Sequence, residues 1–305
     1  MTDFSREILE KWQVRKSKQQ KTAFIARMKQ QYPQLQVEED GNCRNLVLGD
    51  LASAEVVYTA HYDTCARMPI PNLIFPKSFL LSMLYGFAIA LPMIALAVLA
   101  VFLFVLLWRS LGLDSDAIGI IGPAIYLAVM LLLLLMMFMG PANPHTVNDN
   151  TSGVITLVEL YEVMNEEQRK KAAFVFFDME ELGMIGSTRF KKRHAAETAE
   201  KLLLNFDCVS DGDTVAVICK KRVSEDEVKR LEKAFCGGEN KRVIVTRANK
   251  MFYPSDQQLF AHGVGIAALK GKKLLYLDRI HTRRDTVMDV ENIRILVDSA
   301  KKLTE

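Results

Sequence analysis

Two long apolar segments interrupt an otherwise mixed pattern of hydrophobic and polar residues. No charged side chain occurs between Lys77 and Arg109, and a second charge-free stretch covers residues 117–144. Each exceeds the roughly 20 residues that a helix needs to cross about 30 Å of hydrocarbon. A buried helix of a soluble domain rarely has so long a run without a charge. The pattern therefore predicts a transmembrane helical hairpin. Its predicted spans are residues 79–108 and 117–140.

Outside the hairpin, helical spacing of apolar positions alternates with short continuous apolar runs. Residues 3–30 have the helical spacing, which predicts one or two amphipathic helices. An Asp-Gly pair at 40 and 41 between apolar runs predicts a tight turn between two strands. We further predict strands over 54–60, 172–177, 201–206, 214–219, 242–246, 264–269 and 274–277, and helices over 153–164, 224–235, 256–261 and 292–303.

This alternation of buried strands with helices predicts an α/β fold, a three-layer sandwich with a mostly parallel central sheet. The two flanking pieces, residues 1–77 and 141–305, together have the size of one ordinary domain. Two spans return the chain to the same side of a membrane. The two pieces can therefore close into one discontinuous domain, with residues 78–140 as an inserted hairpin.

Composition and charge limit the class of protein. The 305 residues are 50% hydrophobic and 25% charged with a formal net charge of +3, which excludes disordered, collagen-like and disulfide-scaffold proteins. The five cysteines are odd in number and irregularly spaced, as is typical of reduced cytosolic thiols. Residues 1–36 have no apolar stretch of signal-peptide length, and basic residues favour the domain side of the hairpin. We expect an integral membrane protein with its domain on the cytoplasmic face, and no nucleic-acid partner.

Acidic and histidine side chains follow the predicted strands. In open α/β sheets, ligands bind where the strands end at their carboxyl edge. Imidazole and carboxylate together suit zinc, and two ions about 3.5 to 4 Å apart need a bridging carboxylate with further ligands on each side. Two histidines and three carboxylates supply that number, with one carboxylate left for proton transfer. The side chains are His61, Glu180, Glu181 and Asp207 after strands, Asp149 before a helix, and His281 near the last helix, and Asp63, two residues after His61, is a further carboxylate.

The order of these motifs resembles that of the co-catalytic zinc aminopeptidases, a family that includes bacterial leucyl-type aminopeptidases and glutaminyl cyclases. The shared order is His-x-Asp, Asp-Asn-x-Ser-Gly, Glu-Glu, Asp and His-Thr-x-x-Asp-Thr, and it covers the whole chain outside the hairpin. Each fragment alone occurs by chance, whereas the ordered set is specific. The resemblance implies a peptidase with two divalent metal ions, most commonly zinc, that acts on peptides.

The resemblance also implies a role for each matching residue. Asp149 would bridge the metals, Glu181 and His281 would hold one of them, and His61 and Asp207 the other. Glu180 would be the general base, and Asp63 would accept a hydrogen bond from the His61 ring. The family further implies a cis peptide between Asp149 and Asn150. Tyr253 is an expected oxyanion support, although Phe252-Tyr253-Pro254 leaves its alignment open by one position.

Three functions remain open at this point. The residues for both metal sites are present, which favours hydrolysis by an aminopeptidase over glutaminyl cyclisation. The alternatives are a non-catalytic membrane scaffold on the same fold, and a related metallo-carboxypeptidase or amidohydrolase.

The hairpin bears on the substrates. Only ten residues separate Met139 from Asp149, so the metals would lie within roughly 35 Å of the bilayer. The substrates are then either membrane-associated peptides or any peptides met by an anchored enzyme, and small residues of the hairpin would also permit oligomerisation.

Overall fold

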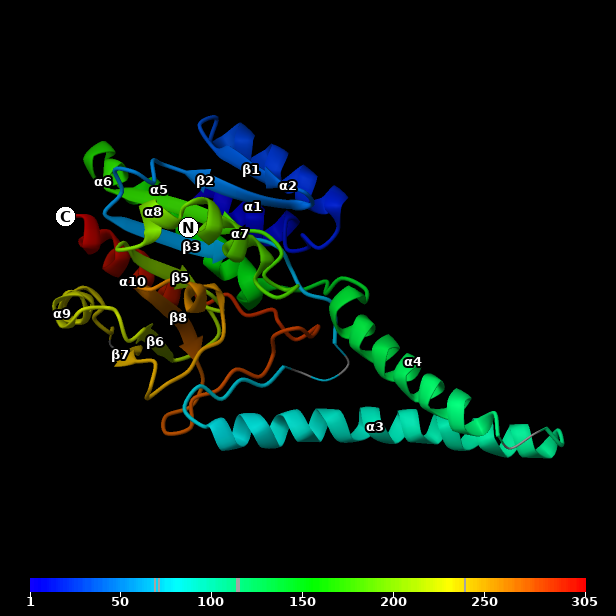
Figure 1. The fold of residues 1–305 in the computed structure, drawn as a ribbon. Coiled ribbons are helices and arrows are strands. Elements are labelled where there is room, and N and C mark those ends of the chain that lie inside the picture. The colour runs from blue at the N-terminus through cyan, green and yellow to red at the C-terminus, as the bar shows by residue number, and fades with distance from the viewer. Residues whose placement is uncertain (69, 71, 114–115, 239) are drawn as a thin grey trace.

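An eight-stranded sheet runs through the computed structural model, which describes residues 1–68, 70, 72–113, 116–238 and 240–305. The strand order is β1-β2-β4-β3-β5-β8-β6-β7 (Figure 1). The pairs β4–β3, β3–β5, β5–β8 and β6–β7 are parallel, and the other three are antiparallel. The predicted mostly parallel α/β sheet is therefore confirmed. The strands are β1 (Gln36–Asp40), β2 (Cys43–Leu48), β3 (Val56–His61), β4 (Ala172–Phe177), β5 (Leu202–Phe206), β6 (Thr214–Cys219), β7 (Arg242–Arg247) and β8 (Gly263–Leu269).

Helices cover both faces of the sheet, which makes the predicted three layers. Successive strand residues point to opposite faces, so Tyr58 packs under one helical layer and Val57 under the other. The first layer contains α1 (Asp3–Lys11), α2 (Lys18–Gln31), α5 (Ser152–Val163), α9 (Glu225–Ala234) and α10 (Val290–Lys301). The second contains α7 (Ile185–Arg193) and the 3-10 turn Asp256–Leu259, and the short helices α6 (Glu166–Lys170) and α8 (Ala195–Thr198) lie in connections.

The central strands β3, β4 and β5 are buried along their whole length. Their sequences are continuous apolar runs because parallel strands covered on both faces meet no water. The register sets His61 opposite Phe177 and Thr59 opposite Asn205. The three strands therefore end at one edge of the sheet, where the acidic and histidine side chains follow.

Several details differ from the sequence prediction, among them one strand and one helix. Residues 274–277 form no strand but only isolated pairs, because the chain reverses at Gly271, with φ +87, and Tyr276 pairs back with Lys270. Helix α7 was not predicted, because its sequence has no helical spacing of apolar residues. Phe190 is the one large apolar side chain that this helix buries.

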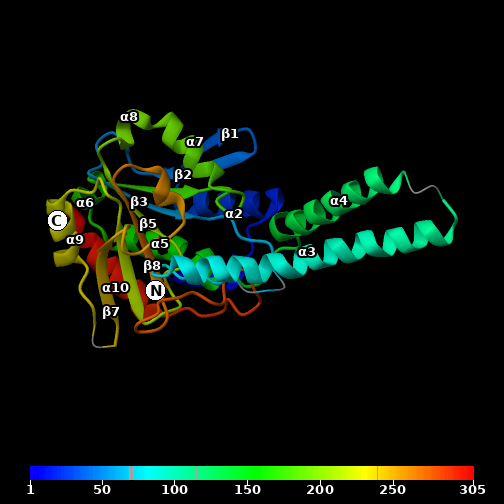
Figure 2. The same ribbon diagram turned by 60° about the horizontal axis from the view of Figure 1, so that its bottom comes forward.

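A hairpin of two long helices, α3 (Phe79–Ser110) and α4 (Ile118–Met139), projects from the domain (Figures 1 and 2). Its bounds agree with the predicted spans. The two helices pack closely near the tip of the hairpin, where a Cβ atom added to Gly122 would lie 3.6 Å from the Val101 side chain. Toward the domain the helices diverge (Figure 1). Ala97 and Gly122 are the only described residues of the two helices that are buried. These are therefore not core helices of the domain.

Candidate metal centre

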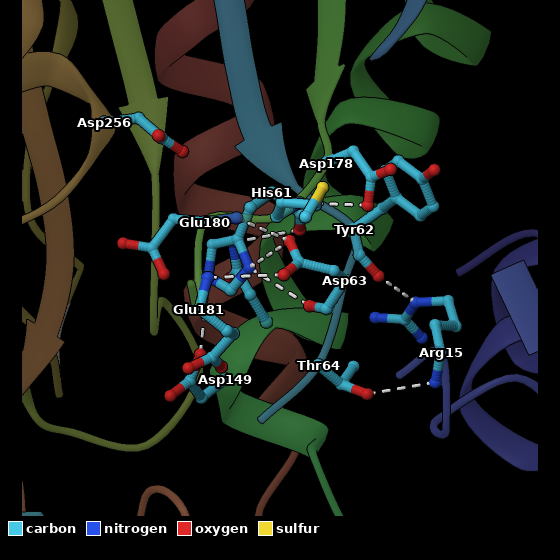
Figure 3. Close-up of polar contacts among 12 residues, drawn as sticks. Arg15, His61, Tyr62, Asp63, Thr64, Asp149, Asp178, Glu180, Glu181 and Asp256 are labelled. Atoms are coloured by element: carbon cyan, nitrogen blue, oxygen red, sulfur yellow. Dashed lines mark hydrogen bonds and ion pairs between the residues drawn. The ribbon is translucent and has the colours of Figure 1, made fainter. Parts of the chain in front are cut away.

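The ends of three central strands bring the predicted metal ligands together. His61 is the last residue of β3, Asp207 follows β5 directly, and Glu181 lies in the turn after β4. Asp149 enters from the turn that precedes α5, and His281 from the loop before α10. Figure 3 shows His61, Asp149 and Glu181 converging from these separate elements.

The Asp149 carboxylate lies between the two histidines. Its Oδ1 is 3.4 Å from His61 Nε2, and its Oδ2 is 3.1 Å from His281 Nε2. Asp207 Oδ1 lies 3.6 Å from the same nitrogen of His61, and Glu181 Oε2 lies 3.4 Å from that of His281. The five side chains thus divide into two groups that share Asp149.

Burial and mutual charge shift the pKa values of these groups. Burial raises the pKa of Glu181 to about 8, although His281 opposes the shift. Burial alone would lower the pKa of His281, but the carboxylates of Glu181 and Asp149 raise it to about 9. Burial likewise works against ionisation of Asp149, yet its hydrogen bonds to the two histidines hold its pKa well below the usual range. Protons on the histidines and on Glu181 thus offset the charge of the buried carboxylates, and divalent cations could take their place.

The donor set fits metal ions. Glu181 Oε1 and Asp207 Oδ1 are buried, and neither accepts a hydrogen bond from any residue that the structure describes. Ligand atoms of His61, Asp149 and Glu181 lie within 4.8 Å of one another, as do those of Asp149, Asp207 and Cys208. Imidazole nitrogen and carboxylate oxygen are ligands that zinc accepts. Buried acceptors without donors, held at this spacing, are those expected where cations complete the coordination.

The Asp63 carboxylate binds a different partner from the one predicted. Its two oxygens accept hydrogen bonds from the backbone amides of Glu180 at 3.0 Å and Glu181 at 3.2 Å. The Nδ1 of His61 lies 3.1 Å from the backbone carbonyl oxygen of Asp63 and 3.7 Å from the nearest carboxylate oxygen. The amides thus occupy the carboxylate, and the backbone carbonyl orients the imidazole (Figure 3). Asp63 therefore holds the turn that carries both glutamates.

Glu180, the predicted base, is half-buried among the same charges. Burial raises the pKa of Glu180 well above its ordinary value, Asp256 and Glu181 add to the shift, and His61 opposes it. Asp256 in turn accepts a hydrogen bond from the Ser187 hydroxyl. A carboxyl group whose pKa is raised can hold and release a proton near neutral pH.

Tyr253, the predicted oxyanion support, is buried beside the centre. Its hydroxyl donates a 3.3 Å hydrogen bond to the backbone carbonyl of Asp207. Burial raises the pKa of this hydroxyl well above its usual value, so it stays a donor. In this structure the hydroxyl donates to the backbone of Asp207, a predicted ligand, so support of an oxyanion would require it to exchange this partner.

Asp285, which was not among the predicted site residues, holds the Asp149 turn. The Asp285 carboxylate accepts hydrogen bonds from the backbone amides of Asn148 at 2.7 Å and Asp149 at 3.0 Å. The signal was available, because Asp285 belongs to the His-Thr-x-x-Asp-Thr motif. The peptide bond between Asp149 and Asn150 is cis, as the resemblance implies.

Arg15 is a second missed residue, and no sequence signal marks it. It lies fully buried in the loop between α1 and α2, where its Nε donates to the Tyr62 carbonyl at 2.5 Å. Its backbone amide donates to the Thr64 hydroxyl at 3.0 Å (Figure 3). Arg15 thus ties the N-terminal helices to the segment that follows His61.

Left-handed backbone marks the centre. Met179, Cys208 and His281 have positive φ angles of 56°, 57° and 61°. Met179 precedes the predicted base Glu180, Cys208 follows the predicted ligand Asp207, and His281 is itself a predicted ligand. A left-handed conformation costs a non-glycine residue about 1–2 kcal/mol, and such positions cluster at functional sites.

A family profile and two solved structures relate the chain to known proteins. The profile of peptidase family M28 matches residues 136–297. The LapA aminopeptidase of Legionella pneumophila is 13% identical with a TM-score of 0.56, over 98% of this chain and 67% of that one. A glutaminyl cyclase of Porphyromonas gingivalis is also 13% identical, with a TM-score of 0.54, over 99% of this chain and 96% of that one. At these identities the likeness concerns the fold. No curated protein sequence gives a match.

Proposed function

Because the chain belongs to peptidase family M28, we propose that it is a dinuclear zinc aminopeptidase anchored in a membrane. Family membership makes it a metallopeptidase, and the proposal adds the number and kind of metal ions, the residues and the membrane. One observation carries it. The two oxygens of Asp149 face two different histidines, at 3.4 and 3.1 Å, which is the arrangement that a carboxylate bridging two ions requires.

The proposed ligands divide between two ions. Asp149 is shared, Glu181 and His281 hold one ion, and His61 and Asp207 hold the other. Two bound divalent ions would lower the pKa of a water molecule and polarise the carbonyl group of the peptide. Glu180 would accept the proton of the attacking water and pass it to the leaving amine. Asp63 would keep Glu180 and Glu181 in place through their backbone amides, and Tyr253 remains the proposed oxyanion support.

The alternatives require a different set of residues. A non-catalytic scaffold would be free to lose ligands, whereas the predicted ones all come together here. Cyclisation at a single ion would leave one of the two groups around Asp149 without a role. A carboxypeptidase or amidohydrolase is separated by the substrate, since blocking the amino terminus of a peptide abolishes cleavage only by an aminopeptidase.

The exposed apolar surface of the hairpin supports membrane anchoring. Helices α3 and α4 each contain an 18-residue segment of high mean hydropathy, 3.0 and 2.6, and both helices are long enough to span a bilayer. Large apolar side chains such as Phe87, Leu103 and Leu131 are more than half exposed. Soluble proteins rarely expose a contiguous apolar surface of more than a few hundred Å². We place α3 and α4 in the bilayer, and the domain of residues 1–77 and 141–305 on its cytoplasmic face.

Metal content tests the proposed centre without any choice of substrate. The full chain, purified in detergent and supplied with zinc, should contain close to two zinc ions per chain by elemental analysis. Asp149→Ala should lose both, because the two groups share this residue. Zinc near zero in the folded wild-type chain would contradict the proposal and favour the scaffold.

A second variant separates binding from catalysis. Glu180→Gln removes the proposed base but none of the proposed ligands, so it should keep its zinc. Its hydrolysis of peptides with a free amino terminus should fall by about 100-fold or more. The matched control is Glu10→Gln, an exposed residue of α1. Full activity of Glu180→Gln would overturn the role of Glu180.

A further inference from the structure

An apolar cavity of about 390 Å³ lies between α3 and α4, at the end of the hairpin next to the domain. Ile89 and Met93 of α3 and Met137 of α4 line it, and Arg67 and Met68 close it on the domain side. Met137 is two residues from the end of α4, which is about 3 Å along the helix axis. With the hairpin in a bilayer, the cavity lies at the edge of the hydrocarbon that faces the domain.

The chain segment from Cys65 to Met68 runs from the metal centre to the lining of the cavity. The Met68 amide donates a 2.8 Å hydrogen bond to the backbone carbonyl of His281, a proposed ligand. The sulfur of Cys65 lies within 4.8 Å of ligand atoms of Glu181 and His281. Three residues of extended chain, from Cys65 to Met68, span at most about 11 Å. A peptide bound at the metal centre would therefore need only about three extended residues to reach the cavity.

The lining of the cavity suits an apolar chain that carries a polar end. Four of its residues are methionines, whose flexible side chains adapt to varied apolar shapes. Arg67 is the one charged residue of the lining, and its guanidinium makes no hydrogen bond or ion pair with any described residue. A cation at the domain side of an apolar cavity favours carbonyl or acidic groups there and apolar groups beyond.

We propose that this cavity binds an apolar segment of the substrate, and that the enzyme acts on amphiphilic peptides held in the bilayer. This inference rests on the proposed peptidase function. The amino end of such a peptide lies at the metal centre, about three residues pass Arg67, and the following apolar residues enter the cavity between the helices. The occupant is a peptide because the lining residue Met68 is hydrogen-bonded to His281 and lies three residues from Cys65 at the metal centre, a nearness that a lipid chain would not require.

Matched peptides test this specificity. Both have the same four amino-terminal residues, and one continues into an apolar stretch of about 18 residues with a charged tag. Burial of one large apolar side chain is worth about tenfold in affinity or more. The zinc-loaded full chain in phosphatidylcholine nanodiscs should therefore cleave the tailed peptide with a kcat/KM at least about tenfold above that of the short one.

Cavity-filling variants should abolish this preference. Met137→Trp, and independently Met93→Trp on the facing helix, should bring the ratio of the two kcat/KM values close to one. The matched control is Leu135→Trp, since Leu135 lies on the opposite face of α4 and is 43% exposed. The control should keep the tenfold preference. A preference that persists in both cavity variants overturns the inference.

Photocrosslinking decides the inference separately from catalysis. A tailed peptide with benzoylphenylalanine in its apolar stretch should crosslink to residues 89–96 and 133–137, and Met137→Trp should reduce these crosslinks at least fivefold relative to Leu135→Trp. Crosslinks that are spread over the outward helix faces and equal in both variants overturn the inference. If these crosslinks form but no peptide is cleaved, the proposed function fails while the cavity assignment stands.

Discussion

At the scale of single residues, two aspartates position the centre through backbone amides. Asp63 binds the amides of Glu180 and Glu181, and Asp285 binds those of Asn148 and Asp149. Each carboxylate thereby fixes a turn whose own side chains point at the proposed metals. Partners of this kind commonly matter almost as much as the ligands themselves. The carboxylates of Asp63 and Asp285 are thus positioning groups.

Replacement of Asp63 by asparagine tests this positioning role. An asparagine side chain at this position can accept at one oxygen only, so one of the two backbone donors loses its partner. We expect Asp63→Asn to lower kcat by about 10–100-fold, with a smaller change in KM and with zinc content largely retained. Steady-state kinetics and elemental analysis on the same sample measure these effects.

The matched control for Asp63 is Asp226→Asn. Asp226 lies on α9 with its side chain 95% exposed, and its loss should change neither kcat nor zinc content. A wild-type kcat in zinc-loaded Asp63→Asn would show that the two hydrogen bonds do not position the glutamates. Loss of zinc together with activity would instead place Asp63 among the groups needed for metal binding.

Residue types and strand ends predicted which side chains meet, but not the hydrogen bonds among them. His61, Asp149 and Asp207 could be grouped from the sequence because parallel strands end at one edge of a sheet. The partners of Asp63 depend on the turn after β4, where Met179 has a left-handed backbone that its residue type does not indicate. The buried Arg15 was unpredictable for a similar reason, since its environment comes from segments distant in sequence.

At the scale of elements, an ion pair joins α1 to α2 on the outside of the first helical layer. Glu7 accepts hydrogen bonds from Arg27 Nε at 2.9 Å and Nη2 at 2.7 Å. The hydrogen bond with Arg27 lowers the pKa of Glu7 from its ordinary value of 4.5 to about 2. The folded state therefore binds the Glu7 proton more weakly than the unfolded state does.

The stability contributed by Glu7 should depend on pH. A lowered pKa stabilises the folded state above about pH 4.5, and this stabilisation is lost as the pH falls toward 2. Glu7→Gln should lower the free energy of unfolding at pH 6 by at most about 1 kcal/mol, because the pair is partly exposed. Chemical denaturation should show this deficit shrinking by pH 3. A deficit that is equal at both pH values, or one shared by Glu10→Gln on the same helix, would contradict the pair's role.

Long elements with one strong signal were predictable, and short ones without it were not. Helices α3 and α4 could be predicted because their apolar runs are too long for other structures. Strands β3, β4 and β5 could be predicted from continuous apolar runs of five or six residues. Helix α7 buries Gly186, Ser187 and Phe190, a set with no apolar period. The 256–261 segment, predicted as a helix, shortens to a 3-10 turn over Asp256–Leu259.

At the scale of the whole molecule, the orientation of the domain can be measured with one thiol. Cys236 is exposed, whereas Cys43, Cys65, Cys208 and Cys219 are buried, and all five are free. With the domain on the cytoplasmic face, a membrane-impermeant maleimide should label Cys236 in opened or inverted membranes and not in intact cells. Cys236→Ser should remain unlabelled in both. Labelling of Cys236 in intact cells would reverse the proposed orientation.

The interleaving of the chain has a consequence for the time at which the protein becomes active during its synthesis. His61 leaves the ribosome before the hairpin, Asp149 after it, and His281 only after the last strand of the sheet has been made. Strand β3 must also wait for β4 and β5, its two neighbours in the sheet. A nascent chain thus holds no complete metal centre until its hairpin has been synthesised. Where the hairpin enters the bilayer as it is made, as the proposed anchoring implies, synthesis itself would confine peptide cleavage to inserted molecules, without a separate inhibitor or removable propeptide.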